Sequence, residues 1–297
     1  RDRFYSADVH GNQITGERLR CISRIINHSC TGEGVLTVVT TMDGIADRLI
    51  PVERFKEAVI TLDYSSEIEP EKLAKKLVAM GFVRTGMVED KGQFAIRGGI
   101  IDIFSYTDEA PVRIELWDTE VDSIRMFDVE SQRSIERLQS YSIFPATEYI
   151  FTEDELKNGL YNIKEECDRQ LECFDYGKRK RTKEQIEAGN NLNKLVADVE
   201  RTGNYEKFTD TLVADTVGLA EYFPEENTLV VLDEPNRLKE CNELTLYEYN
   251  ESMKNRLAAG YVLPSQTNKV KAMNEIISDL RNNKTVSYTH LTLPTNS

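Results

Sequence analysis

Histidine and cysteine are scarce in this sequence, and none of them is spaced as a metal site requires. The 297 residues include three histidines, with no HExxH or HxH arrangement, and five cysteines without a CxxC pair. Zinc sites draw their ligands from such closely spaced pairs, so we expect no metal site. The odd number of cysteines fits free thiols in a reducing compartment better than a disulfide framework. The cysteines are Cys21, Cys30, Cys167, Cys173 and Cys241.

Long apolar runs are also missing. No stretch approaches the roughly 18 apolar residues that a membrane-spanning helix needs, and no signal peptide is visible. We therefore expect a cytoplasmic protein with no membrane partner. The sequence has no initiator methionine and opens on RDRFYSADVHG, from which we expect a fragment of a longer chain.

Positive charge is in short supply. The chain has 37 Lys and Arg against 51 Asp and Glu, for a formal net charge of −14. Such a chain repels phosphate backbones, which argues against tight, sequence-independent DNA binding without a local basic patch. The basic cluster GKRKRTK at 177–183 could contact nucleic acid or an acidic partner, although blocks of like charge are more often solvated. The charge balance suits a protein partner.

A phosphate-binding loop is absent as well. The segment VVLDEP at 230–235 resembles a Walker B strand and ends in Asp233 and Glu234, where an ATPase would hold magnesium and orient a water. The GxxxxGK[ST] loop that would cradle the phosphates does not occur, and the glycine clusters at 31–34 and 97–99 lack its Gly-Lys-Ser/Thr. The three scattered histidines give no Ser-His-Asp or Cys-His set. We predict no catalytic residue and no bound cofactor in this chain.

What the sequence does contain is an alternation of helices and strands. Apolar residues at three- and four-residue spacing predict an amphipathic helix over 17–27. The β-branched run VLTVV at 35–39 predicts a strand buried on both faces, which is typical of a parallel sheet. A short helix over 45–51 and further buried strands over 58–63 and 228–232 continue the alternation. This order indicates an α/β layer.

The pattern changes in the middle of the sequence. Residues 70–80 predict a helix with proline at its first position and glycine just after its end. From about 82 to 150, short strands and tight turns predict an antiparallel meander. We therefore expect a β-rich domain at 66–150 between two halves of an α/β domain, at 1–65 and 151–285.

The last residues, 286–297, contain no Lys, Arg, Asp or Glu, although the rest of the chain is dense in charge. They resemble a translated sequencing adaptor, and we expect a non-native tail. The alternative is a genuine short strand, because THLTL alternates apolar and polar residues.

The meander contains the most distinctive surface. In VRIELW, at 112–117, alternate side chains share a face of the strand, so Arg113, Glu115 and Trp117 point away from the core. Arg and Trp are over-represented in binding hot spots. The alternative for Trp117 is packing on a neighbouring domain or on the aliphatic part of Arg113.

A second arginine stands beside two glycines, in the stretch FAIRGGIIDIF. Gly98 and Gly99 within a strand predict a β-bulge, or close approach of another backbone. A bulge would turn Arg97 out of the regular pleat toward Arg113, giving a recognition patch with Trp117. In the alternative, Arg97 pairs with one of the many surface acids.

Three strings are specific enough to suggest a family: GQFAIRGGIIDIF, PVRIELWDTEVDSIRMFDVESQRSIE and FPATEY. Together with FYSADVHGNQITGERLRCISRII and YFPEENTLVVLDEPNRL, they resemble the UvrB-like N-terminal module of the bacterial transcription-repair coupling factors. The resemblance runs from residue 4 to residue 284. A fragment of UvrB itself, the excision-nuclease subunit, is the alternative, but its phosphate loop and aromatic-rich hairpin are not evident.

The resemblance implies a degenerate helicase-like (P-loop NTPase-like) parallel-sheet domain, interrupted by an inserted, mainly antiparallel UvrA-binding domain. It implies UvrA contact by Arg97, Arg113 and Trp117, and it makes Asp233 and Glu234 a relic of a nucleotide site. Full-length members are ATP-dependent DNA translocases that use ATP and Mg²⁺ and bind RNA polymerase and double-stranded DNA. The resemblance assigns those functions to domains outside this chain.

Overall fold

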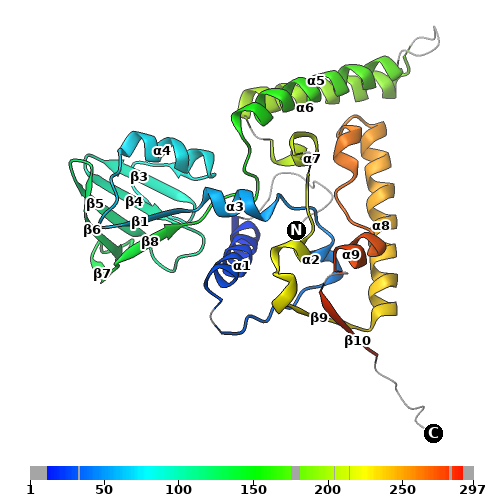
Figure 1. The fold of residues 1–297 in the computed structure, drawn as a ribbon. Coiled ribbons are helices and arrows are strands. Elements are labelled where there is room, and N and C mark those ends of the chain that lie inside the picture. Colours follow the sequence, from blue (N-terminus) through cyan, green and yellow to red (C-terminus); the bar gives the residue numbers. More distant parts are fainter. Residues whose placement is uncertain are drawn as a thin grey trace. The chain divides into compact units, whose positions relative to one another are not determined.

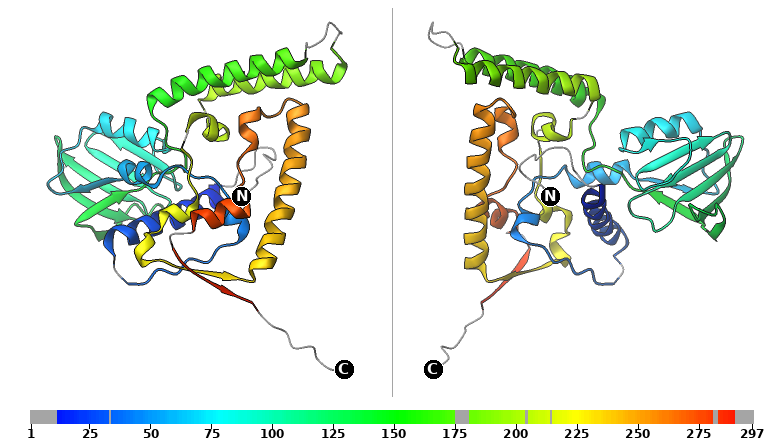
Figure 2. Two further views of the ribbon diagram at one scale, coloured as in Figure 1. Left: turned by 45° about the vertical axis from the view of Figure 1, so that its right-hand side comes forward. Right: turned by 180° about the vertical axis from the view of Figure 1, so that it is seen from behind.

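A computed structural model describes residues 12–32, 34–174, 181–203, 205–213, 215–280 and 283–289 of the chain (Figures 1 and 2). These residues divide into two compact units. The first contains the described residues up to Gly34 together with Ile50–Ile150, and the second contains Val35–Leu49 and the described residues from Phe151 onward. This division differs from the one predicted at residue 66, because residues 50–65 and the first helix lie in the β-rich unit.

The helices of the first unit follow from the periodicity of their apolar residues. They are α1 (Asn12–Thr31), α3 (Val52–Ala58) and α4 (Pro70–Ala79). In α1 the predicted apolar positions are buried, with Leu19 fully enclosed, and α4 begins at the expected proline. The chain leaves α4 through Gly81, whose φ of +87° is a left-handed conformation that favours glycine. Both predicted helices are confirmed.

The first unit is built on a six-stranded sheet with the order β2-β3-β4-β5-β6-β7. Every neighbouring pair is antiparallel except β2–β3, which is parallel, so the predicted meander is confirmed. Two further strands, β1 and β8, pair antiparallel with each other. The strands are β1 (Ile60–Asp63), β2 (Val83–Arg84), β3 (Gln93–Arg97), β4 (Ile100–Phe104), β5 (Val112–Trp117), β6 (Glu120–Phe127), β7 (Ser134–Arg137) and β8 (Ser140–Ile143).

One face of this sheet packs against α4, which lies over it in Figure 1. Leu73 and Leu77 of α4 meet apolar side chains of β3 to β6 in a single core that also takes in β1 and β8. This packing buries one face of the sheet, while the other face carries polar side chains beside a smaller apolar cluster of Val88, Ala95 and Phe104. The residues that share the core include Leu62, Phe94, Ile101, Ile103, Val112, Ile114, Ile124, Tyr141 and Ile143.

The second unit is mainly helical, and its longest elements carry clear end signals. A capping box precedes α5, because Thr152 Oγ1 accepts from the backbone N–H of Glu155 at 3.2 Å and Glu155 Oε2 accepts from the backbone N–H of Thr152 at 2.9 Å. The helices α5 and α6 lie side by side in Figures 1 and 2. The α-helices are α2 (Met42–Ile45), α5 (Glu153–Phe174), α6 (Lys183–Thr202), α7 (Thr209–Leu212), α8 (Pro235–Ala258) and α9 (Met273–Asp279).

Two predictions for residues 34–51 are wrong. The run at 35–39 is not a strand, and Val35 and Val39 are 94% and 92% exposed. A strand has no hydrogen bonds of its own and needs a neighbour, which the described residues do not provide here. The predicted helix at 45–51 is also absent: α2 ends at Ile45, and Leu49 exchanges backbone hydrogen bonds with Val217 at 2.9 and 2.8 Å. That pairing holds the segment extended.

The predicted strands at 58–63 and 228–232 exist, but neither is buried on both faces. β1 pairs antiparallel with β8 rather than in a parallel sheet. β9 (Leu229–Asp233) pairs parallel with β10 (Lys284–Tyr288), and Leu229 and Val231 remain 62% and 60% exposed. β10 includes residues 286–288 of the segment predicted to be a tail, while residues 290–297 lie outside the described part. The described fold is therefore mixed α/β, with antiparallel and mixed sheets.

Candidate partner-binding face

The strand with the predicted recognition residues has two distinct faces. In β5, Val112 and Ile114 are 1% and 0% exposed and belong to the core, while Arg113 and Glu115 lie on the opposite side. We call this side of the six-stranded sheet, which faces away from α4, the outer face. The alternation predicted from the sequence is thus confirmed over 112–115.

Trp117 stands at the end of β5, beyond an irregularity. The register between β5 and β6 shifts between Glu115 and Leu116, which is the signature of a β-bulge. Trp117 then pairs with Glu120 next to a turn in which Asp118 has a φ of +60°. Trp117 is 80% exposed, so the described residues do not cover it. The alternative in which it packs on the stem of Arg113 is wrong for this structure.

The bulge predicted at Gly98 and Gly99 is wrong, because the two glycines form a hairpin turn. Arg97, the last residue of β3, pairs directly with Ile100, the first residue of β4. Gly98 has a φ of +61°, as the first central residue of a type II′ hairpin turn requires. The alternative of close backbone approach is confirmed for Gly99, where an added Cβ would lie 2.8 Å from the carbonyl oxygen of Leu116.

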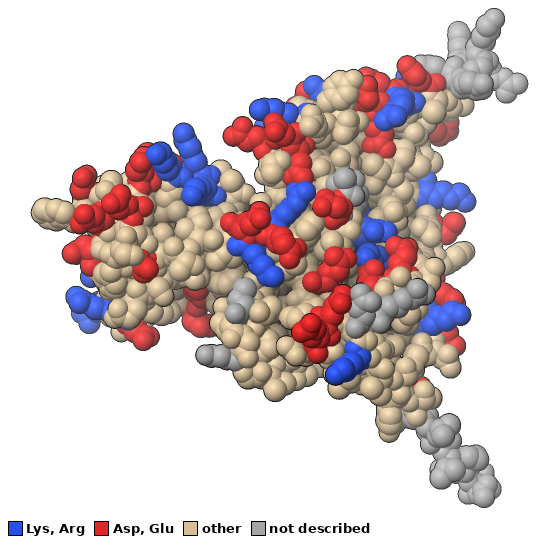
Figure 3. Space-filling view, viewed as in Figure 1, with Lys and Arg blue, Asp and Glu red and all other residues tan. Residues whose placement is uncertain are grey.

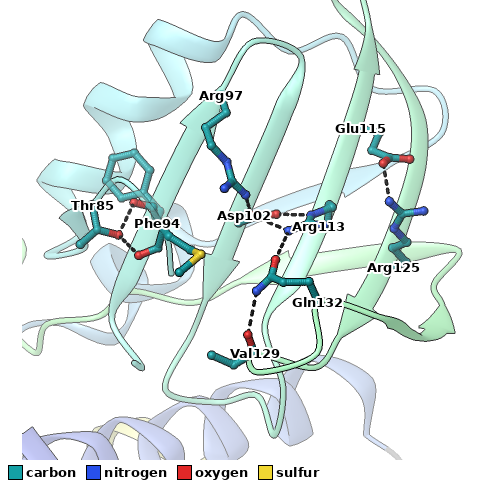
Figure 4. A network of polar contacts seen from close by, with 10 residues as sticks. Thr85, Phe94, Arg97, Asp102, Arg113, Glu115, Arg125, Val129 and Gln132 are labelled. Atoms are coloured by element: carbon teal, nitrogen blue, oxygen red, sulfur yellow. Dashed lines mark hydrogen bonds and ion pairs between the residues drawn. The ribbon is translucent and has the colours of Figure 1, made fainter. Parts of the chain in front are cut away.

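Arg97 and Arg113 meet on one buried carboxylate, that of Asp102 (Figure 4). Arg113 donates from Nε to Oδ1 at 2.6 Å and from Nη2 to Oδ2 at 2.9 Å, and Arg97 donates from Nη2 to Oδ2 at 2.6 Å. Asp102 is 1% exposed. The predicted approach of the two arginines is therefore confirmed, and the acid that binds Arg97 is a buried one rather than a surface one.

Arg113 is held from two further directions. Its Nη2 also donates to Gln132 Oε1 at 2.8 Å, and Gln132 in turn donates to the backbone carbonyl of Val129 at 2.8 Å. Its guanidinium carbon lies 4.3 Å from the ring centroid of Phe127, within cation–π range. The hydrogen bonds to Asp102 raise the pKa of Arg113 above its ordinary value, although burial acts in the opposite direction. Arg113 is therefore a fixed and permanently charged group.

A second ion pair lies beside the first. Arg125 of β6 is directly opposite Arg113 in the register, and like charges placed so are unfavourable. Glu115 relieves this arrangement, because it pairs with Arg125 and accepts from Ser123 Oγ at 2.7 Å. Arg125 thus pairs with Glu115, whereas Arg113 shares Asp102 with Arg97, as Figure 4 shows.

Asp102 and Gln132 were not identified from the sequence. A signal for Asp102 was present, because a single carboxylate interrupts the apolar run IIDIF and lies one strand away from Arg113 in a meander. Gln132 carries no such signal. It reaches Arg113 from the loop after β6, where its φ of +58° closes a turn, and a loop contact of that kind has no periodicity.

The remaining sequence candidates do not form a site in the described residues. Asp233 ends β9, and Glu234 occupies the cap position of α8 with a φ of +54° and no side-chain capping hydrogen bond. Within the described ranges, no three His, Cys, Asp or Glu side chains are grouped as a metal ion would require. None of the helices described is both long and apolar enough to cross a bilayer. Most of the basic cluster at 177–183 lies outside the described residues.

Comparison with known proteins supports a family assignment for the β-rich region. Residues 60–149 match the family model described as the UvrB interaction domain. The chain is 36% identical over 264 residues to the transcription-repair-coupling factor of Bacillus subtilis, covering 86% of this chain and 21% of that protein. Its counterparts in Staphylococcus epidermidis and Staphylococcus haemolyticus are 33% and 32% identical over 248 residues, covering 84% of this chain and 20% of each protein.

The chain thus spans about a fifth of the length of these curated relatives. The similarity extends well beyond the β-rich region, and the resemblance inferred from the sequence strings is confirmed. The conclusion is that residues 60–149 are similar to the UvrB interaction domain, within a chain similar over most of its length to part of the bacterial transcription-repair-coupling factors.

Proposed function

We propose that this chain binds UvrA through the outer face of its six-stranded sheet, and so takes part in DNA repair coupled to transcription. The observation that carries the proposal is the Arg97, Arg113 and Trp117 face, which lies on a domain that matches the UvrB interaction domain. The names of the relatives supply the link to repair and transcription. The exposed groups of the face supply the means of binding.

The chemistry of this face suits a protein partner. Trp117 leaves a large apolar ring in water at 80% exposure, and a partner that covers it gains free energy from the buried area. Arg97 adds a cation with donors to spare at 44% side-chain exposure. On the side of the molecule in Figure 3, acidic and basic side chains of the described residues are interspersed rather than gathered into a basic stripe. With a net charge of −14, this favours protein over DNA.

A fragment of UvrB is the second candidate, since the matched domain is named for that protein. The coupling factors match this chain over 84–86% of its length, far beyond residues 60–149. That extent favours the coupling-factor reading.

We further propose that this chain binds no ATP and catalyses no hydrolysis. It lacks the GxxxxGK[ST] loop, and Asp233 ends a strand without such a loop to complete a phosphate site. The ATP- and Mg²⁺-dependent translocation that the resemblance implies for full-length members, and their binding of RNA polymerase and DNA, would then depend on other domains.

Fluorine NMR tests the proposed UvrA binding directly. Trp117 is the one tryptophan of the 297 residues, so 5-fluorotryptophan incorporation gives a single reporter on the proposed face. Titration with unlabelled UvrA should shift or broaden this resonance in a saturable manner. A folded chain whose resonance and calorimetric signal stay unchanged at high UvrA concentration would overturn the proposal.

A further inference from the structure

Asp102 is a carboxylate with almost no access to water that nevertheless holds two guanidinium groups. Its Oδ1 accepts from Arg113, and its Oδ2 accepts from both Arg113 and Arg97, at distances of 2.6 to 2.9 Å. A buried carboxylate is costly unless it is paired and hydrogen-bonded, and here every contact is charge-assisted. Because one negative charge faces two positive charges, the cluster keeps one positive charge at the surface of the domain.

The two arginines differ in what they can offer to a partner. The side chain of Arg113 is 12% exposed and is enclosed by Asp102, Gln132 and the ring of Phe127. The side chain of Arg97 is 44% exposed, and within the described part of the chain it donates its hydrogen bond to Asp102. A guanidinium has five N–H donors. Arg97 therefore retains donors for a partner, whereas Arg113 has most of its own engaged within the domain.

The single bond to Asp102 fixes the direction of an otherwise mobile side chain. Arg97 is the last residue of β3 and stands beside the hairpin turn at Gly98. An unanchored arginine would lose rotamer entropy on binding, and a side chain already held in its bound geometry avoids much of that loss. Asp102 is in turn fixed by its two bonds to Arg113.

We infer that Asp102 is the positioning residue of the partner-binding face. It holds the Arg97 guanidinium in place to receive a carboxylate of the partner, and Arg113 acts mainly by fixing Asp102 rather than by contact. The inference rests on the proposed UvrA binding. It gives Arg97 and Arg113 separate roles, although the sequence resemblance implies UvrA contact by both. It predicts that the effect of Asp102 on affinity passes through Arg97.

A double-mutant cycle in the full 297-residue chain tests this path. Asp102→Asn keeps the shape of the side chain and removes its charge, and it should weaken UvrA binding by about tenfold or more. In an Arg97→Ala background the same change should weaken UvrA binding by less than about threefold, since the guanidinium that Asp102 positions is already absent. If Asp102→Asn weakens UvrA binding by the same factor in the wild-type and Arg97→Ala backgrounds, Asp102 has a general structural role. That result would overturn the inference.

The matched control is Glu71→Gln. Glu71 forms an exposed ion pair with Arg84, at 3.2 Å, on the α4 side of the same domain. The Glu71→Gln variant should keep a UvrA affinity within about twofold of the wild type. Wild-type chain that fails to bind UvrA would sink the proposed function and this inference with it. Wild-type binding that Arg97→Ala weakens and Asp102→Asn does not would sink the inference alone.

Nitrogen NMR of the unmutated chain provides a readout that does not depend on the folding of Asp102→Asn. The Nη resonances of Arg97, assigned by their loss in Arg97→Lys, should be resolved and show slow rotation about the Nε–Cζ bond in the absence of UvrA. Averaged Nη resonances would mean that Asp102 does not hold Arg97 in solution, and they would overturn the inference without any variant of Asp102.

Discussion

Arg113 stacks its guanidinium on the ring of Phe127, 4.3 Å from carbon to centroid, on the side of the sheet that faces away from α4. Phe127 is 1% exposed, so this arginine covers an aromatic ring that would otherwise meet water. An arginine in this position stabilises the fold by stacking its planar guanidinium on the ring as well as by its charge.

Arg113→Lys should therefore destabilise the chain although the charge is kept. Lysine cannot donate two parallel bonds to Asp102 or stack as a plane on Phe127, and we expect a loss of about 2 kcal/mol in the free energy of unfolding. Urea unfolding followed by circular dichroism measures it. Arg84→Lys, at an exposed pair with Glu71, is the control and should change the free energy by less than about 0.5 kcal/mol. Equal effects of the two variants would contradict the stacking role.

Trp117→Ala should separate binding from stability. Because Trp117 is 80% exposed, its removal should change the free energy of unfolding by less than about 0.5 kcal/mol. It should weaken UvrA binding by about 30-fold, which corresponds to a hot-spot loss of roughly 2 kcal/mol. Calorimetric titration beside an unfolding curve gives both numbers. Val78→Ala, at 56% exposure on α4, is the control and should leave both unchanged. Wild-type affinity in Trp117→Ala would remove this residue from the proposed face.

Gly99→Ala tests the close approach of the hairpin turn to β5. The added Cβ would meet the carbonyl oxygen of Leu116 at 2.8 Å, and a backbone atom cannot move aside as a flexible side chain can. We expect a loss of about 1–3 kcal/mol in stability and weaker UvrA binding, because Leu116 adjoins Trp117. Gly86→Ala is the control, since nothing lies within 4 Å of its added Cβ. Comparable unfolding curves for the two variants would contradict this account.

The buried hydroxyl of Tyr141 predicts a loss of stability in alkali. Burial raises its pKa well above the ordinary 10.0. The neighbouring Asp108 carboxylate, which accepts a hydrogen bond from the Tyr141 hydroxyl at 2.6 Å, raises the pKa further. The folded state then keeps a proton that the unfolded state releases. The contribution is complete below pH 10.0 and is lost as the pH rises through the folded-state pKa.

Tyr141→Phe should remove this alkaline loss, at the expense of about 1–2 kcal/mol at neutral pH from the missing hydrogen bond. Urea unfolding at pH values from neutral to above 10 measures the slope. Tyr64→Phe, at an exposed tyrosine, should retain the alkaline loss of the wild type. If the free energy of unfolding of Tyr141→Phe falls with rising pH as steeply as that of the wild type, another group causes the alkaline loss.

Asp233→Asn tests the absence of a nucleotide site. The wild-type chain should bind no ATP in the presence of Mg²⁺ and should show no turnover, so the variant should match it in both respects. Fluorescent-nucleotide titration and a phosphate-release assay measure these quantities. Turnover by the wild type that disappears in the variant would restore the Walker B interpretation of this strand.

The sequence by itself determined the elements whose hydrogen bonds are local. The helices α1 (Asn12–Thr31) and α4 (Pro70–Ala79) form because their backbone hydrogen bonds close within each segment, and one apolar stripe selects the buried side. Alternation over 112–115 likewise assigned Arg113 to the outer face, since the pleat of a strand fixes which side chains share a side. The family strings then identified the β-rich region.

Only the tertiary structure decided the rest. The run at 35–39 has the composition of a buried strand, but a strand exists only where another supplies its hydrogen bonds, and here none does within the described residues. The glycines after Arg97 make a turn rather than a bulge because β3 and β4 pair up to its edge. Asp102 receives two arginines from different strands. The network closes only when the three strands and the loop that carries Gln132 are paired and folded, which is why the alternation within one strand could not predict its hydrogen bonds.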